Sequence, residues 1–343
     1  THCISSAASD VYKRQMFEYS DTQFIKQYSL IKRWVTNMYS TSNAPNAYIL
    51  GGQPGAGKTA LQNLIRKNNK NIIVINADSF RKFHPRFNEI HKQYGNDSPK
   101  YTQPFINQVT EKLIDELSAE KYNLIIEGTL RTAIVPINTC LELKKKGYQV
   151  ELHIMAVKRA ISYESTILRY ENAIAQGEIP RATAKQHHDM VADAISDNLD
   201  IIEKAKAFDS IKLFNRNGEC LYPAVGHSSA AIVENEMLNG WWSIDETEQL
   251  EEIVTAVTDY KAARNADDFT DYQKHAKEVI AFAESNQYHY IKVSREQSEQ
   301  LRNAGISVEG DTAKDEISVI RIPPTQIAKA EQILKQNPYI PKK

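Results

Sequence analysis

Residues 47–69 constrain the fold more than any other part of the chain, because they join a short apolar strand to a helix through a glycine-rich loop. Glycines let the backbone turn successive N–H groups toward an anion, and the start of the following helix adds partial positive charge. We predict a nucleotide-phosphate site, with Lys58 near the β- and γ-phosphates and Thr59 as a ligand of Mg²⁺. The loop matches G-x-x-x-x-G-K-[ST] and comprises Gly52, Gln53, Pro54, Gly55, Ala56, Gly57, Lys58 and Thr59.

Apolar strands alternate with amphipathic helices along the first two thirds of the chain. This alternation is typical of a parallel sheet that helices cover on both faces. Together with the loop, this alternation predicts an α/β fold of the P-loop NTPase and kinase type. The strands are expected at 47–50, 72–75, 124–126, 149–157 and 211–214, and the helices at about 20–38, 60–69, 102–120, 136–146, 159–176 and 183–204.

Length and composition limit the classes of protein that fit. The chain has 343 residues, about two domains' worth. Its 42 basic and 43 acidic residues give a net charge of −1, so a nucleic-acid partner is not expected, although a local basic groove is still allowed. No apolar run approaches the roughly 20 residues that span a bilayer, so no membrane partner is expected. Three widely spaced cysteines are typical of a reducing compartment, and we expect a cytoplasmic protein.

Composition shifts divide the chain into three parts. Residues 1–15 precede the first methionine without an apolar period, and we interpret them as a non-native or disordered leader. Residues 16–223 are predicted to form the P-loop domain, which a Gly-, Ser- and Pro-rich stretch ends. Residues 224–343 form an extension, with a helical pattern at 243–285 and a smaller α+β pattern at 288–335. The extension could inhibit the first domain, recruit a partner or stabilise its neighbour.

Two carboxylates follow apolar strands at the sheet edge where the loop is expected. Ligands of open α/β sheets collect at the carboxyl ends of the strands. Asp78 follows the second strand, where it can orient a hydroxyl group and accept its proton during phosphoryl transfer; the alternative is a helix N-cap. Glu127 ends the third strand, where it can contact Mg²⁺ through water or hold a substrate hydroxyl; the alternative is a carboxylate bound by backbone amides.

Three arginines lie where they could face a ligand. Arg131 comes soon after Glu127, and Arg169 and Arg181 flank a Gly- and Pro-containing break between two long helices. A guanidinium group presents a rigid fork to phosphate oxygens and neutralises charge in the transition state. For Arg169 and Arg181, a surface ion pair is the alternative role.

Five blocks of sequence resemble the zeta toxin family, the P-loop kinases of toxin–antitoxin systems. The resemblance covers roughly residues 18–222. The blocks agree in order and spacing: LGGQPGAGKT at 50–59, NADSF at 76–80 with HP at 84–85, YNLIIEGT at 122–129, MAV at 155–157 and RAT at 181–183.

The resemblance implies ATP-dependent phosphorylation of UDP-N-acetylglucosamine on the 3′-hydroxyl of its amino sugar, which poisons peptidoglycan synthesis. It implies that Lys58 and Thr59 hold phosphates and Mg²⁺, that Asp78 is the base, and that Glu127 holds the sugar. Arg169 and Arg181 would clamp the triphosphate, and a small helical antitoxin would cover the ATP site. Four residues fall at positions that resemble the family's sugar-nucleotide contacts: Glu111, Thr129, Arg131 and Thr139.

The residues by themselves leave other functions open. The loop does not separate kinases from ATPases, although no Asn-Lys-x-Asp element follows to read guanine. A kinase with another acceptor, such as a different sugar nucleotide, an antibiotic or a nucleic-acid end, is one alternative. A non-enzymatic switch that responds to ATP is another, but such a switch has no use for the carboxylate of Asp78.

Overall fold

The computed structural model describes residues 18–224, 229–309 and 317–336. The chain divides into two compact units between Leu238 and Asn239. The leader predicted at residues 1–15 lies outside the described residues.

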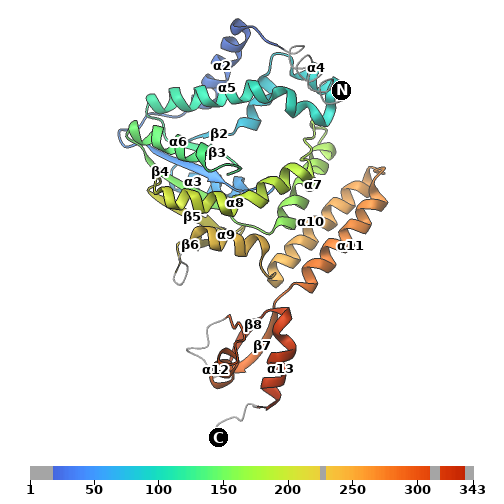
Figure 1. Ribbon diagram of the computed structural model, residues 1–343. Coiled ribbons are helices and arrows are strands. Elements are labelled where there is room, and N and C mark those ends of the chain that lie inside the picture. The colour runs from blue at the N-terminus through green and yellow to red at the C-terminus, as the bar shows by residue number, and fades with distance from the viewer. Residues whose placement is uncertain (1–17, 225–228, 310–316, 337–343) are drawn as a thin grey trace, which may run out of the picture. The chain divides into compact units, whose positions relative to one another are not determined.

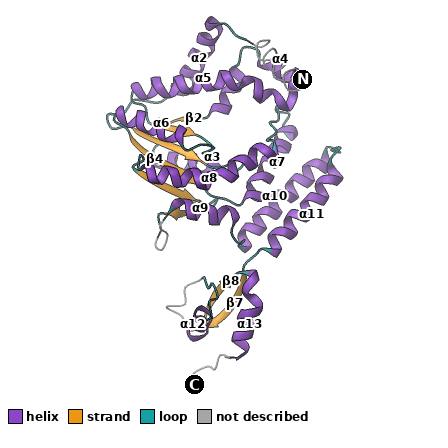
Figure 2. Ribbon diagram, in the orientation of Figure 1, coloured by secondary structure: helices purple, strands orange, loops and turns teal. Residues whose placement is uncertain are grey.

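A six-stranded sheet forms the centre of the first unit, between helices (Figure 2). Its strand order is β2-β3-β1-β4-β5-β6, in which the first five strands are parallel and β6 runs antiparallel to β5. The predicted α/β fold with a parallel sheet is confirmed, and β6 is an addition. The strands are β1 (Asn46–Gly51), β2 (Ile73–Ile75), β3 (Leu124–Glu127), β4 (Gln149–Met155), β5 (Ser210–Phe214) and β6 (Cys220–Tyr222).

The helices of the first unit follow the predicted alternation, and α4 and α9 are additions to it (Figure 1). Among the described residues, no helix is both long enough and apolar enough to cross a membrane. The α-helices are α2 (Asp21–Thr36), α3 (Lys58–Asn68), α4 (Phe87–Tyr94), α5 (Ser98–Ala119), α6 (Ile134–Lys145), α7 (Arg159–Ala175), α8 (Lys185–Ala205) and α9 (Ala230–Asn239); η1 (Ala77–Phe83) and η2 (Gly95–Asp97) are short 3₁₀ segments.

One apolar core joins the sheet to α2, α5, α6, α8 and α9. Side chains alternate along a strand, so Ala47 and Ile49 enter this core while Tyr48 and Leu50 face the other side. Buried side chains recur on α5 at three- and four-residue steps, which is why this face of the helix packs on β2. The helices thus hold the strand ends, and the loops that follow them, in place.

The glycine-rich loop packs closely against α7. Gly55 has a φ of +78°, and a Cβ atom there would lie 1.9 Å from the carbonyl oxygen of Ser162 and 2.8 Å from Cγ2 of Thr166. The first of these neighbours is backbone and cannot turn aside. Only glycine therefore fits both the conformation and the space at this position.

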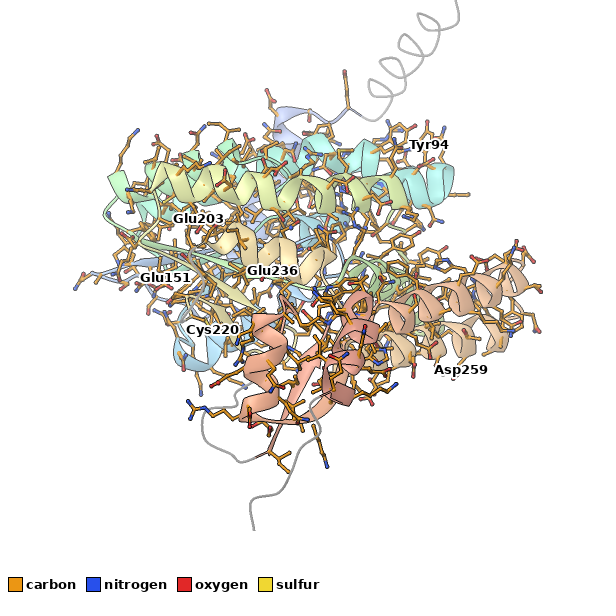
Figure 3. The ribbon with its side chains drawn as sticks, turned by 60° about the horizontal axis from the view of Figure 1, so that its bottom comes forward. Tyr94, Glu151, Glu203, Cys220, Glu236 and Asp259 are labelled. Carbon is orange, nitrogen blue, oxygen red and sulfur yellow. The ribbon has the colours of Figure 1, made fainter. Side chains whose placement is uncertain are left out.

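Helix α9 belongs with the first unit. Its N-terminus is capped by Glu203 at the end of α8, whose carboxylate accepts hydrogen bonds from the N–H groups of Ala230 (2.8 Å) and Ala231 (3.0 Å). Figure 3 shows Glu203 and Glu236 on these two helices. The division of the chain therefore falls at the last residue of α9, because apolar residues of this helix enter the central core. The boundary predicted between residues 223 and 224 lies before α9.

The second unit contains the elements predicted for the extension. A helical pair spans the segment predicted as helical, and the strand–helix–strand–helix order predicted for 288–335 is confirmed. Val293, Leu301 and Ile320 form part of its small core. Its elements are α10 (Ile244–Ala263), α11 (Phe269–Ser285), β7 (His289–Ser294), α12 (Arg295–Asn303), β8 (Ile317–Ile322), η3 (Pro324–Gln326) and α13 (Ile327–Gln336), and β7 and β8 pair antiparallel.

Replacing Gly55 by alanine should destabilise the first unit more than the same change at Gly177. Gly177 has a similar φ of +68°, but a Cβ atom there would meet nothing within 4 Å. G177A should therefore cost about 1 kcal/mol of backbone strain, and G55A more than about 2 kcal/mol. Thermal unfolding of the two full-length variants measures the difference. Equal losses would show that the contact with Ser162 carries no cost.

A buried carboxyl group on α9 should make stability depend on pH. Glu234 is fully buried, and neither of its carboxyl oxygens has a hydrogen-bond partner among the residues that the structure describes. Burial raises the pKa of Glu234 from 4.5 to about 8. The folded state thus favours the neutral form of Glu234. The contribution of this preference to the stability of the fold is complete below pH 4.5 and is lost as the pH rises through about 8.

We expect E234Q to remove that loss. The variant should gain on the order of 2–4 kcal/mol relative to wild type between pH 5 and pH 9. Thermal midpoints measured across this range report the gain, and E236Q on the exposed side of the same helix is the matched control. A wild-type and an E234Q curve that stay parallel would contradict the prediction.

Candidate active site

The loop between β1 and α3 is shaped for an anion. Gly52 and Gly57 have φ values of +135° and +103°, and no side chain caps the N-terminus of α3. Nζ of Lys58 donates to the carbonyl oxygens of Gly52 (2.7 Å) and Gln53 (3.1 Å), so this side chain folds back over the loop. Burial lowers the pKa of Lys58 to about 8. Free N–H groups and a buried ammonium group together can hold phosphate oxygens.

Gln53 fastens the loop to the sheet. Its side chain is fully buried, and Nε2 donates to the carbonyl oxygen of Val157, just beyond β4, at 3.0 Å. The carbonyl oxygen of Gln53 also accepts the N–H of Ala56 at 3.1 Å, which closes a turn around Pro54. The hydrogen bonds of Gln53, the second residue of the loop, thus hold the loop in place.

Thr59 is the residue that the sequence predicts as a ligand of Mg²⁺. Thr59 lies exposed in the first turn of α3, next to Lys58. Mg²⁺ prefers a hydroxyl and one or two carboxylates together with phosphate oxygens. The described residues contain no group of three or more His, Cys, Asp or Glu side chains suited to a metal ion, so a bound phosphate would have to complete the coordination.

Asp78 lies in η1, directly after β2, and two arginines hold it. Its carboxylate contacts Nη1 of Arg181, and Oδ1 accepts from Nε of Arg81 at 3.0 Å. Burial alone would raise the pKa of Asp78, but the charges of Arg181 and Arg81 lower it below its usual value. The N-cap alternative for Asp78 is wrong, because the side chain of Asn76 accepts the N–H of Asp78 at 3.0 Å.

Arg81 positions Asp78 from the side of α5, a role that the sequence did not suggest. Its Nη1 donates to the carbonyl oxygen of Pro99 (2.9 Å) and to Oγ1 of Thr102 (2.7 Å), and Nη2 donates to Gln103 (2.8 Å). These bonds tie the guanidinium group to α5, so its Nε presents a fixed donor to Asp78. The one local signal was the spacing of three residues between Asp78 and Arg81.

Glu127 ends β3 beside the loop. It pairs with Leu50 in the register of β1, and its Oε2 accepts hydrogen bonds from Asn76 (2.6 Å) and Gln62 (2.8 Å). Side-chain amides, not the backbone amides of the alternative, therefore bind this carboxylate. Burial raises the pKa of Glu127, and the charge of Lys58 opposes the rise.

Arg169 and Arg181 come from α7 and from the connection between α7 and α8. Nη2 of Arg169 donates to Oγ1 of Thr183 at 3.1 Å, while Arg181 reaches Asp78. Besides burial, the charges of four side chains shift the pKa of Lys58. The five residues predicted as catalytic therefore interact through their charges and form one cluster. Those five are Lys58, Asp78, Glu127, Arg169 and Arg181.

The four residues expected to contact a sugar nucleotide have fewer contacts with this cluster. Thr129 is half-buried just after β3. Burial lowers the pKa of His187, and the charges of Arg131 and Arg181 lower it further. Thr139 donates to the carbonyl oxygen of Val135 at 2.9 Å on α6, and Glu111 is exposed on α5. Within the described ranges, no hydrogen bond or ion pair joins Glu111 or Thr139 to the cluster.

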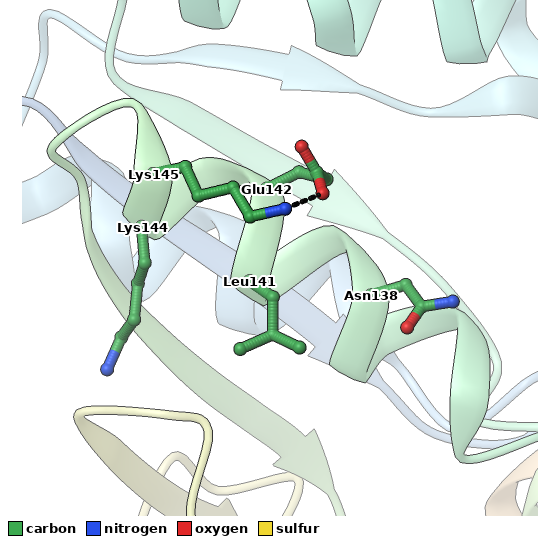
Figure 4. A pocket seen from close by; sticks show the side chains of 5 residues that line it. All are labelled: Asn138, Leu141, Glu142, Lys144 and Lys145. Carbon is green, nitrogen blue, oxygen red and sulfur yellow. Dashed lines mark hydrogen bonds and ion pairs between the residues drawn. The ribbon is translucent and has the colours of Figure 1, made fainter.

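A surface hollow lies over α6, outside this cluster (Figure 4). All five lining residues come from that one helix, and Lys145 pairs with Glu142 at 2.6 Å. The hollow contains none of the predicted site residues. Its lining is Asn138, Leu141, Glu142, Lys144 and Lys145.

Known proteins are similar to this chain in sequence and in fold. The chain is similar to toxin PezT from Streptococcus pneumoniae serotype 4, with 40% identity over 237 residues, which are 68% of this chain and 94% of that protein. It is 44% identical over 184 residues to toxin zeta from Streptococcus pyogenes, and the match spans 53% of this chain and 64% of that protein.

A solved structure from the PezAT chromosomal toxin–antitoxin system of Streptococcus pneumoniae has a TM-score of 0.66 at 38% identity and covers 71% of this chain and 98% of that one. The family model described as zeta toxin matches residues 31–226, more than half of the chain, and this match ends before the second unit. The resemblance inferred from the five sequence blocks is confirmed, and the chain belongs to the zeta toxin family.

Proposed function

We propose that the chain is an ATP-dependent kinase that phosphorylates UDP-N-acetylglucosamine on the 3′-hydroxyl of its amino sugar, and that it acts as the toxin of a toxin–antitoxin pair. The observation that carries the proposal is the meeting of Asp78, Arg181 and Lys58 in one site. A triphosphate needs the cations, and a hydroxyl acceptor needs the carboxylate.

The loop and the cations would hold the triphosphate. Lys58 would exchange the carbonyl oxygens of Gly52 and Gln53 for the β- and γ-phosphates, which gives its charge an anionic partner. Arg169 and Arg181 would neutralise the charge that spreads over the transferred group. Thr59 would supply a hydroxyl ligand to Mg²⁺, and that ion when bound would offset the negative charge of the phosphates.

Asp78 would direct the acceptor. Arg181 is the strongest of the charges that lower the pKa of Asp78, so its move to a phosphate would raise that pKa and open one carboxylate oxygen. That oxygen would accept the proton of the sugar hydroxyl while the hydroxyl oxygen bonds to the γ-phosphorus. The bond from this phosphorus to the β–γ bridging oxygen breaks, and ADP leaves. Arg81 would keep the second oxygen in place throughout.

The acceptor and the partner rest on family membership. Glu127 would hold the sugar next to Asp78, and Glu111, Thr129, Arg131 and Thr139 are the proposed further contacts. The similar solved structure comes from a toxin–antitoxin system, and this supports an antitoxin as the partner of this chain. A switch without catalysis is disfavoured because the site includes an ionised carboxylate beside its cations.

The direct test is incubation of the full chain with ATP, Mg²⁺ and a panel of sugar nucleotides. We expect UDP-N-acetylglucosamine to gain the mass of one phosphate. D78N keeps the size of the side chain but loses its basicity, so it should bind ATP as wild type does and lose at least about 1,000-fold in kcat. Equal turnover by D78N, or no transfer to any sugar nucleotide, would refute the proposal.

Activity should fall on the alkaline side because of Lys58. Its pKa of about 8 in the free protein means that the cation is lost as the pH rises through this value. kcat/KM for ATP should therefore decline near pH 8, whereas kcat should hold to higher pH, since a bound triphosphate raises the pKa of Lys58 again.

K58R provides the control for this pH profile. Arginine stays charged at every accessible pH, so the variant should lack the decline even if its overall rate is lower. A decline with the same midpoint in K58R would assign it to another group.

A further inference from the structure

Arg216 contacts the back of the glycine-rich loop from the turn between β5 and β6. Its Nε donates to the carbonyl oxygen of Ala56 at 3.2 Å, and its Nη2 donates to the carbonyl oxygen of Gly55. Nη2 also donates to Oγ of Ser165 on α7 at 2.8 Å. The steps of the proposed reaction do not use Arg216.

The charge of Arg216 lacks an anionic partner. In the part of the chain that the structure describes, its hydrogen-bond acceptors are neutral, namely two carbonyl oxygens and one hydroxyl. Burial lowers the pKa of Arg216 to about 10, and no nearby carboxylate offsets this effect. Keeping a desolvated cation against the anion-binding loop is costly unless the loop's ligand supplies the opposite charge.

The two loop contacts have a geometric consequence. In a trans peptide the C=O and N–H groups point in opposite directions, so a held carbonyl also aims the next N–H. Arg216 holds the carbonyl of Ala56, and the N–H of Gly57 therefore points away from Arg216. Gly55 and Gly57 both have positive φ, and without a restraint these flexible positions would allow the peptide planes between them to turn.

We infer that Arg216 is a positioning residue for nucleotide binding, which holds the peptide planes on either side of Ala56 so that the N–H of Gly57 is presented to phosphates. This inference rests on the proposed function only in that the loop binds a nucleotide. It is independent of which acceptor receives the phosphate. A positioning role requires the fork of the guanidinium group, because two carbonyl oxygens are held at once.

Calorimetric titration of the full chain with ADP and with ATP, both with Mg²⁺, tests the inference. We expect R216A to weaken both nucleotides by a similar factor, about tenfold or more, because the loop cradles the phosphates that both share. R216K restores the charge without the fork, and its affinities should stay at least severalfold below wild type. Wild-type affinities in R216A, a loss confined to ATP, or full rescue by R216K would each overturn the positioning role.

Two controls separate this role from general damage. S165A removes the third partner of Arg216 but leaves both loop contacts, so its affinities should stay within about twofold of wild type. R159A removes an arginine that pairs with Asp193 on the surface, and it should bind nucleotide as wild type does. A purely structural Arg216 would lower the thermal midpoint of R216A and leave the dissociation constant of the folded protein unchanged, which would overturn the inference.

The same titration distinguishes the two proposals. If the wild-type chain binds neither ADP nor ATP, both the proposed function and the role of Arg216 fail. If it binds both nucleotides but phosphorylates no sugar nucleotide, only the proposed acceptor fails.

Discussion

The parallel pairing of β1 with β3 and β4 is the constraint on which the rest of the site depends. Parallel strands bring their carboxyl ends to one edge, and here Leu50 pairs with Glu127 while Gly51 pairs with Ile154. The loop after β1 and the carboxylate that ends β3 therefore become neighbours. A shift of one residue in this register would turn Glu127 to the other face and would separate it from Lys58.

The charges of the site bind one another or the backbone. Arg181 contacts Asp78, and Lys58 lies on the loop's own carbonyl oxygens. These internal partners offset part of the cost of burying the charges. The opposite pKa shifts of Asp78 and Glu127 reflect their direct partners, because two arginines hydrogen-bond to Asp78 whereas Glu127 accepts from neutral side-chain amides.

Residues that directly follow a strand were the ones that sequence could locate. Asp78 and Glu127 were placed correctly beside the loop because the strand pattern is local and the edge rule is general. Arg81, Gln62 and Asn76 were missed, since their partners depend on how η1 and α3 pack against the ends of β2 and β3. Glu111 and Thr139, which came from the resemblance alone, remain predicted contacts.

The sequence by itself determined the loop motif, the family and the strands and helices other than β6, α4 and α9, because each is carried by short patterns of apolar residues and glycines. Only the tertiary structure decided that α9 belongs to the first unit and that Glu234 is buried without a partner. It also decided that Arg216 reaches a loop 160 residues earlier in the chain. The physical reason is that such contacts form between segments distant in sequence, and no local pattern records the packing that brings them together.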